Sequence, residues 1–150
     1  GLYGKKIKII KMRTMQMNAE VNGVQWSCKN DKRITKVGNF LRMTRIDELP
    51  QLFSVLNGDM SLIGPRPERP EIEIELSKNI PKYYLRYNVL PGLSGWAQVN
   101  YPYGASINDA KNKYSYDIFY ISNFSIFLDI LIFFKTVKLV LNAQGSISKN

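Results

Sequence analysis

The sequence predicts an α+β fold that is mostly helical, with a few short strands, in one domain of 150 residues. Two stretches, residues 46–56 and 107–141, place apolar side chains at helical spacing. Residues 7–12 alternate lysine with isoleucine and methionine, which is typical of a short strand. With 45% apolar and 12% aromatic residues, the chain can bury a core and is not a disordered polymer.

The first half of the chain predicts three elements joined by polar segments. A strand is expected over Ile7–Met12, a loop over residues 18–33 and a short helix over Lys36–Thr44. The next helix should begin at about Asp47, a good N-cap residue, because Pro50 is tolerated only in the first turn. It should end at the Asn57-Gly58 pair.

The second half of the chain predicts mainly helices. The sequence indicates, in order, a stiff loop over residues 64–67, helices over 68–77 and 81–87, a turn over 91–95, a strand over 96–100, a turn over 101–105 and helices over 107–141 with a break near 122–125. The final segment, residues 126–141, is amphipathic. Charged residues interrupt it too often for a transmembrane span, so it either packs on the domain or lies in a membrane interface.

The charge pattern points to an anionic partner. The net charge is +9, and residues 1–50 hold 11 basic against 4 acidic groups. Nucleic acid, anionic lipid and a phosphorylated small substrate all suit such a surface. A nucleic-acid binder would need aromatic side chains among its basic residues, and this region has only Tyr3, Trp26 and Phe40. We therefore expect no nucleic-acid partner.

The amino-acid inventory restricts the chemistry. The chain has no histidine and one cysteine, which excludes Ser-His-Asp and Cys-His catalysis and a Cys-rich zinc site. Acid–base or covalent steps must come from carboxylates, lysine, tyrosine or cysteine. Any metal should be a hard ion with oxygen ligands, such as Mg²⁺.

The strongest chemical signal is the Asp47-Glu48 pair at a predicted helix start, with Arg42 and Arg45 just before it. The helix N-terminus and both arginines should hold the Asp47 carboxylate ionised, with its pKa lowered. Such a carboxylate can attack phosphorus and form an acyl phosphate, while Glu48 holds Mg²⁺. The structural alternative is an N-cap aspartate followed by a first-turn glutamate, which is a common pattern.

Three other segments with basic residues are candidates for the same site. Pro65 and Pro67 restrict the backbone on both sides of Arg66, whose guanidinium suits bidentate phosphate contacts. Lys11 and Arg13 follow the predicted strand, and Arg86 precedes the small-residue turn at 91–95. The alternatives are a surface linker, a solvated basic face and a turn that only packs.

Together these segments resemble the bacterial sugar transferase family, the monotopic phosphoglycosyl transferases that act on polyprenyl phosphate. The resemblance covers nearly the whole chain in the expected order, and its segments are KMRTM, KVGNFLRMTRIDELPQLFSVLN, GDMSLIGPRPE, RYNVLPGLSGWAQVN and YDIFYISNFSIFLDILIFFKT. The combination of DELPQ, GPRPE and PGLSGWAQVN is specific, although each piece alone is weak. Residues 100–110 look like the branch that primes exopolysaccharide synthesis.

The resemblance implies a reaction and roles for residues. Such enzymes transfer a sugar 1-phosphate from a UDP-sugar to undecaprenyl phosphate and release UMP. Asp47 matches the nucleophile that forms a phosphosugar ester, and Glu48 matches a residue that helps to bind Mg²⁺. The remaining matched positions contact the nucleotide or its phosphates or lie in basic motifs near the site: Lys11, Arg13, Arg42, Arg66 and Arg86.

The resemblance also implies a location. Family members act at the cytoplasmic face of the bacterial inner membrane and carry a re-entrant membrane helix before the catalytic domain. We expect residues 1–150 to be the catalytic domain without that helix, with interfacial C-terminal helices and a membrane surface as partner. A non-catalytic membrane-surface module of the same fold is the alternative. The transferred sugar is not predicted, and self-association as a homo-oligomer is left open.

Overall fold

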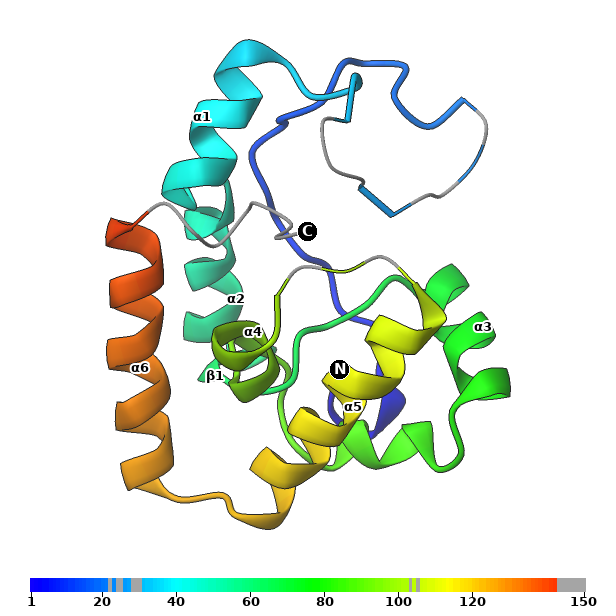
Figure 1. The fold of residues 1–150 in the computed structure, drawn as a ribbon, viewed down its shortest axis with the longest axis vertical. Helices are drawn as coiled ribbons and strands as arrows, with labels where there is room; N and C mark the ends of the chain where they lie inside the picture. The colour runs from blue at the N-terminus through cyan, green and yellow to red at the C-terminus, as the bar shows by residue number, and fades with distance from the viewer. Residues whose placement is uncertain (22, 24–25, 28–30, 103, 105, 143–150) are drawn as a thin grey trace.

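The computed structural model describes residues 1–142 except 22, 24–25, 28–30, 103 and 105 (Figure 1). The expected loop over 18–33 and turn over 101–105 therefore lie partly outside the described residues. The described helices are η1 (Leu2–Gly4), α1 (Lys36–Thr44), η2 (Ile46–Gln51), α2 (Leu52–Leu56), α3 (Pro70–Asn79), η3 (Tyr83–Asn88), α4 (Trp96–Asn100), α5 (Ile107–Ser122) and α6 (Ile126–Leu141), where η marks a 3₁₀ helix.

Two short strands complete the described elements and confirm a mostly helical α+β fold. Strands β1 (Ser61–Ile63) and β2 (Gly92–Ser94) pair in parallel, with Ser61 opposite Gly92 and Ile63 opposite Ser94. Within the segment over 91–95, which was expected as a turn, Gly92–Ser94 therefore form a strand. Small residues explain the difference, because a side chain on Gly92 would meet the backbone nitrogen of Gly64 at 2.1 Å. The missing side chains let the two segments approach closely.

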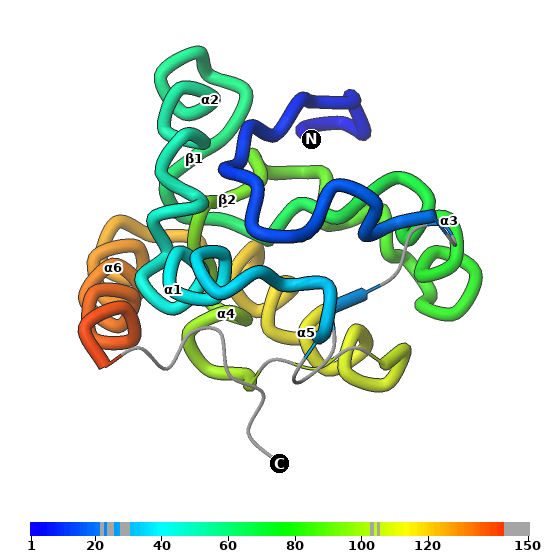
Figure 2. The backbone as a smooth tube through the Cα atoms, turned by 90° about the horizontal axis from the view of Figure 1, so that it is seen from above, coloured from blue at the N-terminus to red at the C-terminus, as the bar shows by residue number. Residues whose placement is uncertain are grey.

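Helix α5 connects the two parts of the core. Its Tyr120 packs with Ile63 and Ile132 in one buried cluster, and its Tyr114 packs against the other, which Leu76, Ile80 and Tyr83 form. In Figure 1, α5 accordingly runs between α3 and α6. Figure 2 shows the N-terminal segment lying across the molecule between α2 and α3.

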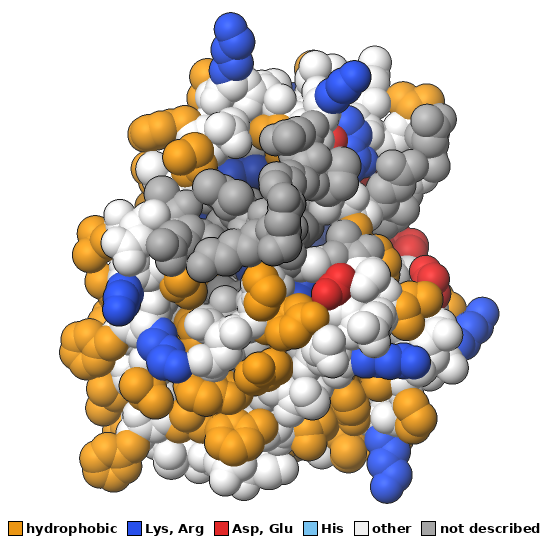
Figure 3. All heavy atoms as spheres, in the orientation of Figure 1, with side chains coloured by type: hydrophobic (Ala, Val, Ile, Leu, Met, Phe, Trp, Pro, Cys, Tyr) orange, Lys and Arg blue, Asp and Glu red, His pale blue; other side chains and the backbone are white. Residues whose placement is uncertain are grey.

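Helix α6 leaves most of its apolar surface exposed. Only Ile132 is buried, whereas Phe127 and Phe134 are 81% and 65% exposed. Figure 3 shows hydrophobic side chains gathered along the edge that α6 occupies. Among the described residues, none of the helices has the length and apolar character to cross a membrane.

Most of the expected helices are confirmed, including the break between α5 and α6. The strand expected over Ile7–Met12 is wrong. The segment has no strand partner, and its one backbone bond to the site region runs from the Met12 N–H to the Asp47 carbonyl at 3.0 Å. The strand expected over Trp96–Asn100 is also wrong. Trp96 and Val99 both pack on the first core cluster, and residues three apart share a face only in a helix.

Candidate functional site

The site begins at a sharp reversal of the chain between α1 and η2. Arg45 adopts a left-handed conformation with φ of 59°, ends α1 and is also the N-cap of η2. Asp47 is therefore inside the first turn rather than at the N-cap, contrary to expectation. Because no side chain caps η2, the Asp47 carboxylate is not occupied by helix capping. Asp47 and Glu48 are both 8% exposed.

Glu48 is the centre of a cluster of positive charges that come from three segments. Its Oε1 accepts from Lys11 Nζ at 3.2 Å, and its Oε2 accepts from Arg45 at 3.3 Å. Arg66 donates to both oxygens in a bidentate contact. Burial alone would raise the pKa of Glu48, but the charges of Arg66, Lys11 and Arg45 together hold it far below its usual range. Glu48 is therefore ionised and fixed in place.

Asp47 has the opposite environment. Its Oδ1 is buried and has no hydrogen-bond partner among the described residues. Burial first, and the neighbouring Glu48 charge second, raise the pKa of Asp47. Lys11, Arg42 and Arg45 oppose this rise without reversing it. The expected lowering of the Asp47 pKa is therefore wrong, because sequence reasoning counted the arginines and the helix terminus but not the burial.

Arg42 is held on the same side of the site by the N-terminal segment. Its Nε donates to Thr14 Oγ1 at 2.9 Å, and one of its terminal nitrogens donates to Ser27 Oγ at 3.2 Å. Thr14 is buried and accepts the Thr35 N–H at its carbonyl. The helix that carries Arg42 can approach Thr14 this closely because Gly38 has no side chain. A Cβ atom at Gly38 would overlap the Thr14 carbonyl.

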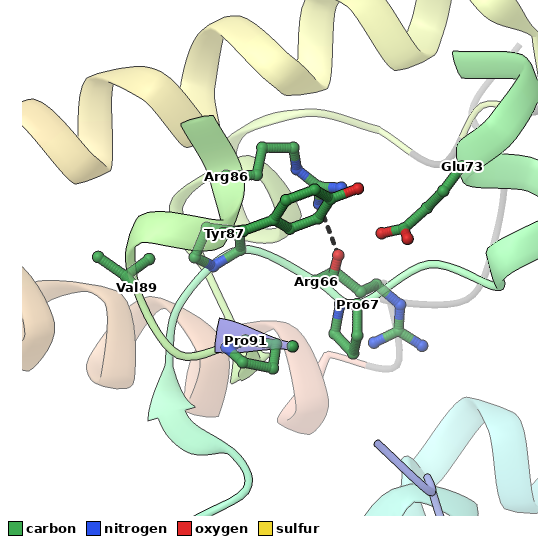
Figure 4. Close-up of a pocket in the computed structure, with 9 residues that line it drawn as sticks. Arg66, Pro67, Glu73, Arg86, Tyr87, Val89 and Pro91 are labelled. Carbon is green, nitrogen blue, oxygen red and sulfur yellow. Dashed lines mark hydrogen bonds between the residues drawn. The ribbon is translucent and has the colours of Figure 1, made fainter. Parts of the chain in front are cut away.

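Arg66 reaches Glu48 from the loop after β1, and Arg86 supports that loop from behind. One terminal nitrogen of Arg86 donates to the Arg66 carbonyl at 2.6 Å, the bond drawn in Figure 4. Arg86 also pairs with Asp117 at 2.8 Å and donates to the Tyr83 hydroxyl at 2.5 Å. It lines a small pocket behind the loop together with Tyr87, and it makes no described contact with Glu48.

The structure thus brings together most of the residues that the sequence singled out. Lys11, Arg42, Arg45 and Arg66 lie around Asp47 and Glu48. Arg13 is exposed, and no contact places it in this group.

Arg45 was noted in the sequence as a neighbour of Asp47 but was not named as a site residue. Sequence reasoning missed Asp117 and Tyr83, which hold Arg86. The available signal for Asp117 was a carboxylate among the aromatic and apolar residues of the segment YSYDIFYI.

The residues at this site do not form a metal centre by themselves. Among the described residues, no group of three or more acidic, histidine or cysteine side chains could hold a metal ion. Both Glu48 oxygens already accept from cationic side chains. Mg²⁺ commonly uses one or two carboxylates together with substrate phosphates. An Mg²⁺ ion at this site would therefore need the oxygens of a phosphorylated ligand in addition to Glu48.

A buried carboxylate pair surrounded by lysine and arginine side chains is an arrangement suited to binding an anionic, phosphate-bearing ligand. The comparison with protein families agrees. The sequence model of the bacterial sugar transferases matches residues 1–143. The chain belongs to the bacterial sugar transferase family.

Several relatives are similar to nearly the whole of this chain. A UDP-N-acetylgalactosamine-undecaprenyl-phosphate N-acetylgalactosaminephosphotransferase of Aeromonas hydrophila is 47% identical over 146 residues, 97% of this chain and 34% of the relative. A UDP-glucose:undecaprenyl-phosphate glucose-1-phosphate transferase of Escherichia coli is 42% identical over 139 residues, 91% of this chain and 30% of the relative. A transferase of the same name from Caulobacter vibrioides is 39% identical, over 97% of this chain and 55% of the relative. The chain spans about a third of the length of the first two.

The buried Arg86–Asp117 pair predicts a large loss of stability when one partner is removed. Replacing Arg86 with Met leaves the Asp117 charge buried and unpaired, which should cost about 3–5 kcal/mol in the free energy of unfolding. The change Arg86→Met/Asp117→Leu removes both charges and should recover part of this loss. Denaturant unfolding measures both. The matched control is Arg69→Met, because the Arg69–Glu20 pair is half exposed and should contribute less than about 1 kcal/mol. Equal losses for Arg86→Met and Arg69→Met would contradict the assignment.

Proposed function

We propose that this chain catalyses the transfer of a sugar 1-phosphate from a UDP-sugar to undecaprenyl phosphate, through an aspartyl-phosphosugar intermediate, with release of UMP. The reaction would initiate the assembly of an exopolysaccharide or another glycoconjugate. The names of the relatives support the donor and acceptor classes. The observation that carries the proposal is the buried, unpaired oxygen of Asp47 beside a Glu48 that is fully engaged by cations.

The charge balance of the site supports a diphosphate donor. Lys11, Arg42, Arg45 and Arg66 carry four positive charges, and Asp47 and Glu48 carry two negative ones. The difference, four minus two, leaves a surplus of two positive charges in a partly buried site. The diphosphate of a UDP-sugar carries about two negative charges, so its binding would neutralise the site.

The chemistry proceeds by two displacements at one phosphorus atom. A lone pair of an Asp47 carboxylate oxygen forms a bond to the β-phosphorus of the UDP-sugar. The bond from that phosphorus to the bridging oxygen breaks, and UMP leaves with that oxygen and the electron pair. A phosphate oxygen of undecaprenyl phosphate then attacks the same phosphorus. The Asp47 carboxylate leaves, and the product is undecaprenyl diphosphosugar.

The surrounding residues support both displacements. Glu48 holds Lys11, Arg45 and Arg66 together, and these cations would stabilise the charge that develops on the phosphate oxygens. Burial of Asp47 raises its pKa and leaves its carboxylate with less bound water. Less water therefore has to be displaced when a diphosphate approaches this carboxylate. Glu48 is the protein ligand that we assign to Mg²⁺. The ion, when bound, would neutralise part of the diphosphate charge.

The exposed apolar surface supports a membrane location. The lipid acceptor must be presented at a bilayer, and α6 exposes Phe127, Phe134 and Leu141. Its last turn also carries Lys138. Apolar side chains of this kind insert into the headgroup boundary of a bilayer. We place the chain at the cytoplasmic face of the bacterial inner membrane, where UDP-sugars are available.

The nucleophile assignment predicts the behaviour of Asp47→Asn. An amide cannot form the ester, so this variant should release no UMP above background in an assay with a panel of UDP-sugars and undecaprenyl phosphate. Incubation of the wild-type protein with donor alone should give a phosphosugar adduct on Asp47 in peptide mass spectrometry. The matched control is Asp59→Asn, which lies outside the site and should keep wild-type turnover. UMP release by Asp47→Asn at near wild-type rate, or an adduct on another residue, would refute the mechanism.

The assignment of Mg²⁺ to Glu48 predicts that the ion binds together with a diphosphate. Mg²⁺ alone should leave the melting temperature unchanged, because the protein offers too few free oxygen ligands. Mg²⁺ with UDP should raise it by several degrees more than UDP with a chelator, since a ligand that binds the folded state stabilises it. Glu48→Gln should remove the Mg²⁺-dependent part of this shift. A shift with Mg²⁺ alone would instead show a resident metal site.

The membrane assignment predicts a loss of vesicle binding when the exposed phenylalanines of α6 are removed. Phe127→Ser/Phe134→Ser should lower the partition coefficient by about tenfold or more, because two large apolar side chains leave the bilayer boundary. Co-sedimentation with vesicles of zwitterionic and anionic lipid measures this. The control is Ile74→Ser/Tyr84→Ser, at two positions that are each 62% exposed away from α6. An equal loss in both double variants would exclude α6 as the docking element.

A further inference from the structure

The role of Glu48 as a ligand of Mg²⁺ requires one of the neighbouring cations to move. Both carboxylate oxygens of Glu48 accept hydrogen bonds from cationic side chains, which belong to Lys11, Arg45 and Arg66. Mg²⁺ binds oxygen at about 2.0–2.1 Å and carries two positive charges, so it repels a cationic side chain on the same oxygen. At least one of the three side chains therefore has to leave Glu48 when the ion binds.

The two oxygens of Glu48 are not held equally. Oε1 takes the close contact from Arg66 and a bond of 3.2 Å from Lys11 Nζ. Oε2 accepts from Arg45 at 3.3 Å and from the other terminal nitrogen of Arg66 at 3.5 Å. Charge-assisted hydrogen bonds are commonly about 2.7–2.9 Å long, so Oε2 is the more weakly held oxygen. Arg66 keeps its closer contact on Oε1, and Arg45 is the cation whose departure frees Oε2.

Arg45 has a backbone conformation that favours glycine. Its φ of 59° is one of three positive values among the described residues other than glycine, and it ends α1. Helices that end in this conformation usually have glycine or asparagine there, because other side chains are strained. The position of its charge at the C-terminus of α1 and its pairing with Glu48 offset this strain. A purely structural role of Arg45 would consist of these two contributions.

The guanidinium of Arg45 is also close enough to serve a ligand at Asp47. Its charge acts on Asp47 as well as on Glu48. The side chain of Arg45 is 31% exposed, whereas that of Glu48 is 10% exposed. The arginine is therefore the partner at the edge of the pair. Arg42 differs, because it donates to two hydroxyl groups of the N-terminal segment rather than to Glu48.

We propose that Arg45 is an exchange residue, which pairs with Glu48 Oε2 in the ligand-free protein and binds the diphosphate when the donor arrives with Mg²⁺. This inference rests on the proposed function. Oε2 becomes a ligand of the ion, and the guanidinium passes to phosphate oxygens, to which it can donate in a bidentate contact. Arg45 thereby couples the two ligands, because it is released to the diphosphate only when the ion has replaced it on Glu48.

The test measures the Kd for UDP by calorimetry, with saturating Mg²⁺ and with a chelator, in the wild type and in Arg45→Asn. Asparagine tolerates a positive φ and carries no charge. In Mg²⁺ the Kd should rise about tenfold, because a charged contact to the diphosphate is lost. In the chelator it should stay within about threefold of wild type, because the guanidinium there remains on Glu48. Arg45→Gly removes the whole side chain and should give the same pattern.

A second arm of the test uses Glu48→Gln. In this variant position 48 offers Arg45 no negative charge, so the guanidinium is available to the diphosphate without the ion. Adding Arg45→Asn to Glu48→Gln should therefore raise the Kd for UDP about tenfold in the chelator. A change of less than about threefold in this arm contradicts the exchange.

Two controls separate the exchange from a structural role. Arg42→Gln removes a cation that is held by hydroxyl groups, so it should raise the Kd for UDP by the same factor with and without Mg²⁺. Arg69→Asn removes a half-exposed arginine outside the carboxylate pair and should leave both values unchanged. The proposal is overturned if Arg45→Asn changes the two values by equal factors or changes neither. It is also overturned if Mg²⁺ does not increase the affinity of the wild type for UDP.

The titrations also separate this inference from the proposed function. If Asp47→Asn is inactive while the effect of Arg45→Asn does not depend on Mg²⁺, the transferase assignment stands and the exchange is refuted. If the wild-type protein binds no UDP and releases no UMP from any UDP-sugar, both are refuted.

Discussion

The site depends on the requirement that a buried charge be paired. Glu48 lies 8% exposed, and an isolated carboxylate there would be strongly unfavourable. It is stabilised by Lys11, Arg45 and Arg66, which come from the N-terminal segment, the end of α1 and the loop after β1. These three segments are distant in sequence. The glutamate therefore joins them, and in the same arrangement it gathers the cations that a phosphorylated substrate requires.

A second layer of contacts fixes the position of Arg66. Its backbone carbonyl accepts from Arg86, which is itself held by Asp117 on α5. The loop lies against β2 so closely that glycine is required at Gly64 and Gly92. The guanidinium that contacts Glu48 is thus carried on a loop supported by a buried ion pair and by close backbone packing. Such support holds a binding group in place at low entropic cost.

The sequence predicted the helices and the composition of the site better than it predicted strands and environments. The periodicity of residues 107–141 located α5 and α6, because long amphipathic patterns persist whatever they pack against. Strands were harder to predict, because β2 exists only through its partner β1 and the alternating segment at residues 7–12 found none. Burial of Asp47 is likewise a tertiary property, and it reversed the expected direction of the pKa shift.

The proposed division of tasks between Asp47 and Glu48 follows from their environments. The two carboxylates are neighbours in sequence and equally buried, yet the pKa of Glu48 is lowered and that of Asp47 is raised. Pairs of acids whose pKa values are driven apart commonly have different roles in a reaction. A carboxylate bound by three cations is a weak nucleophile, because its lone pairs are engaged. Because Glu48 takes most of the direct contacts, Asp47 keeps an unpaired oxygen, which the proposed reaction uses to attack phosphorus, while the nearby cations favour its ionised form.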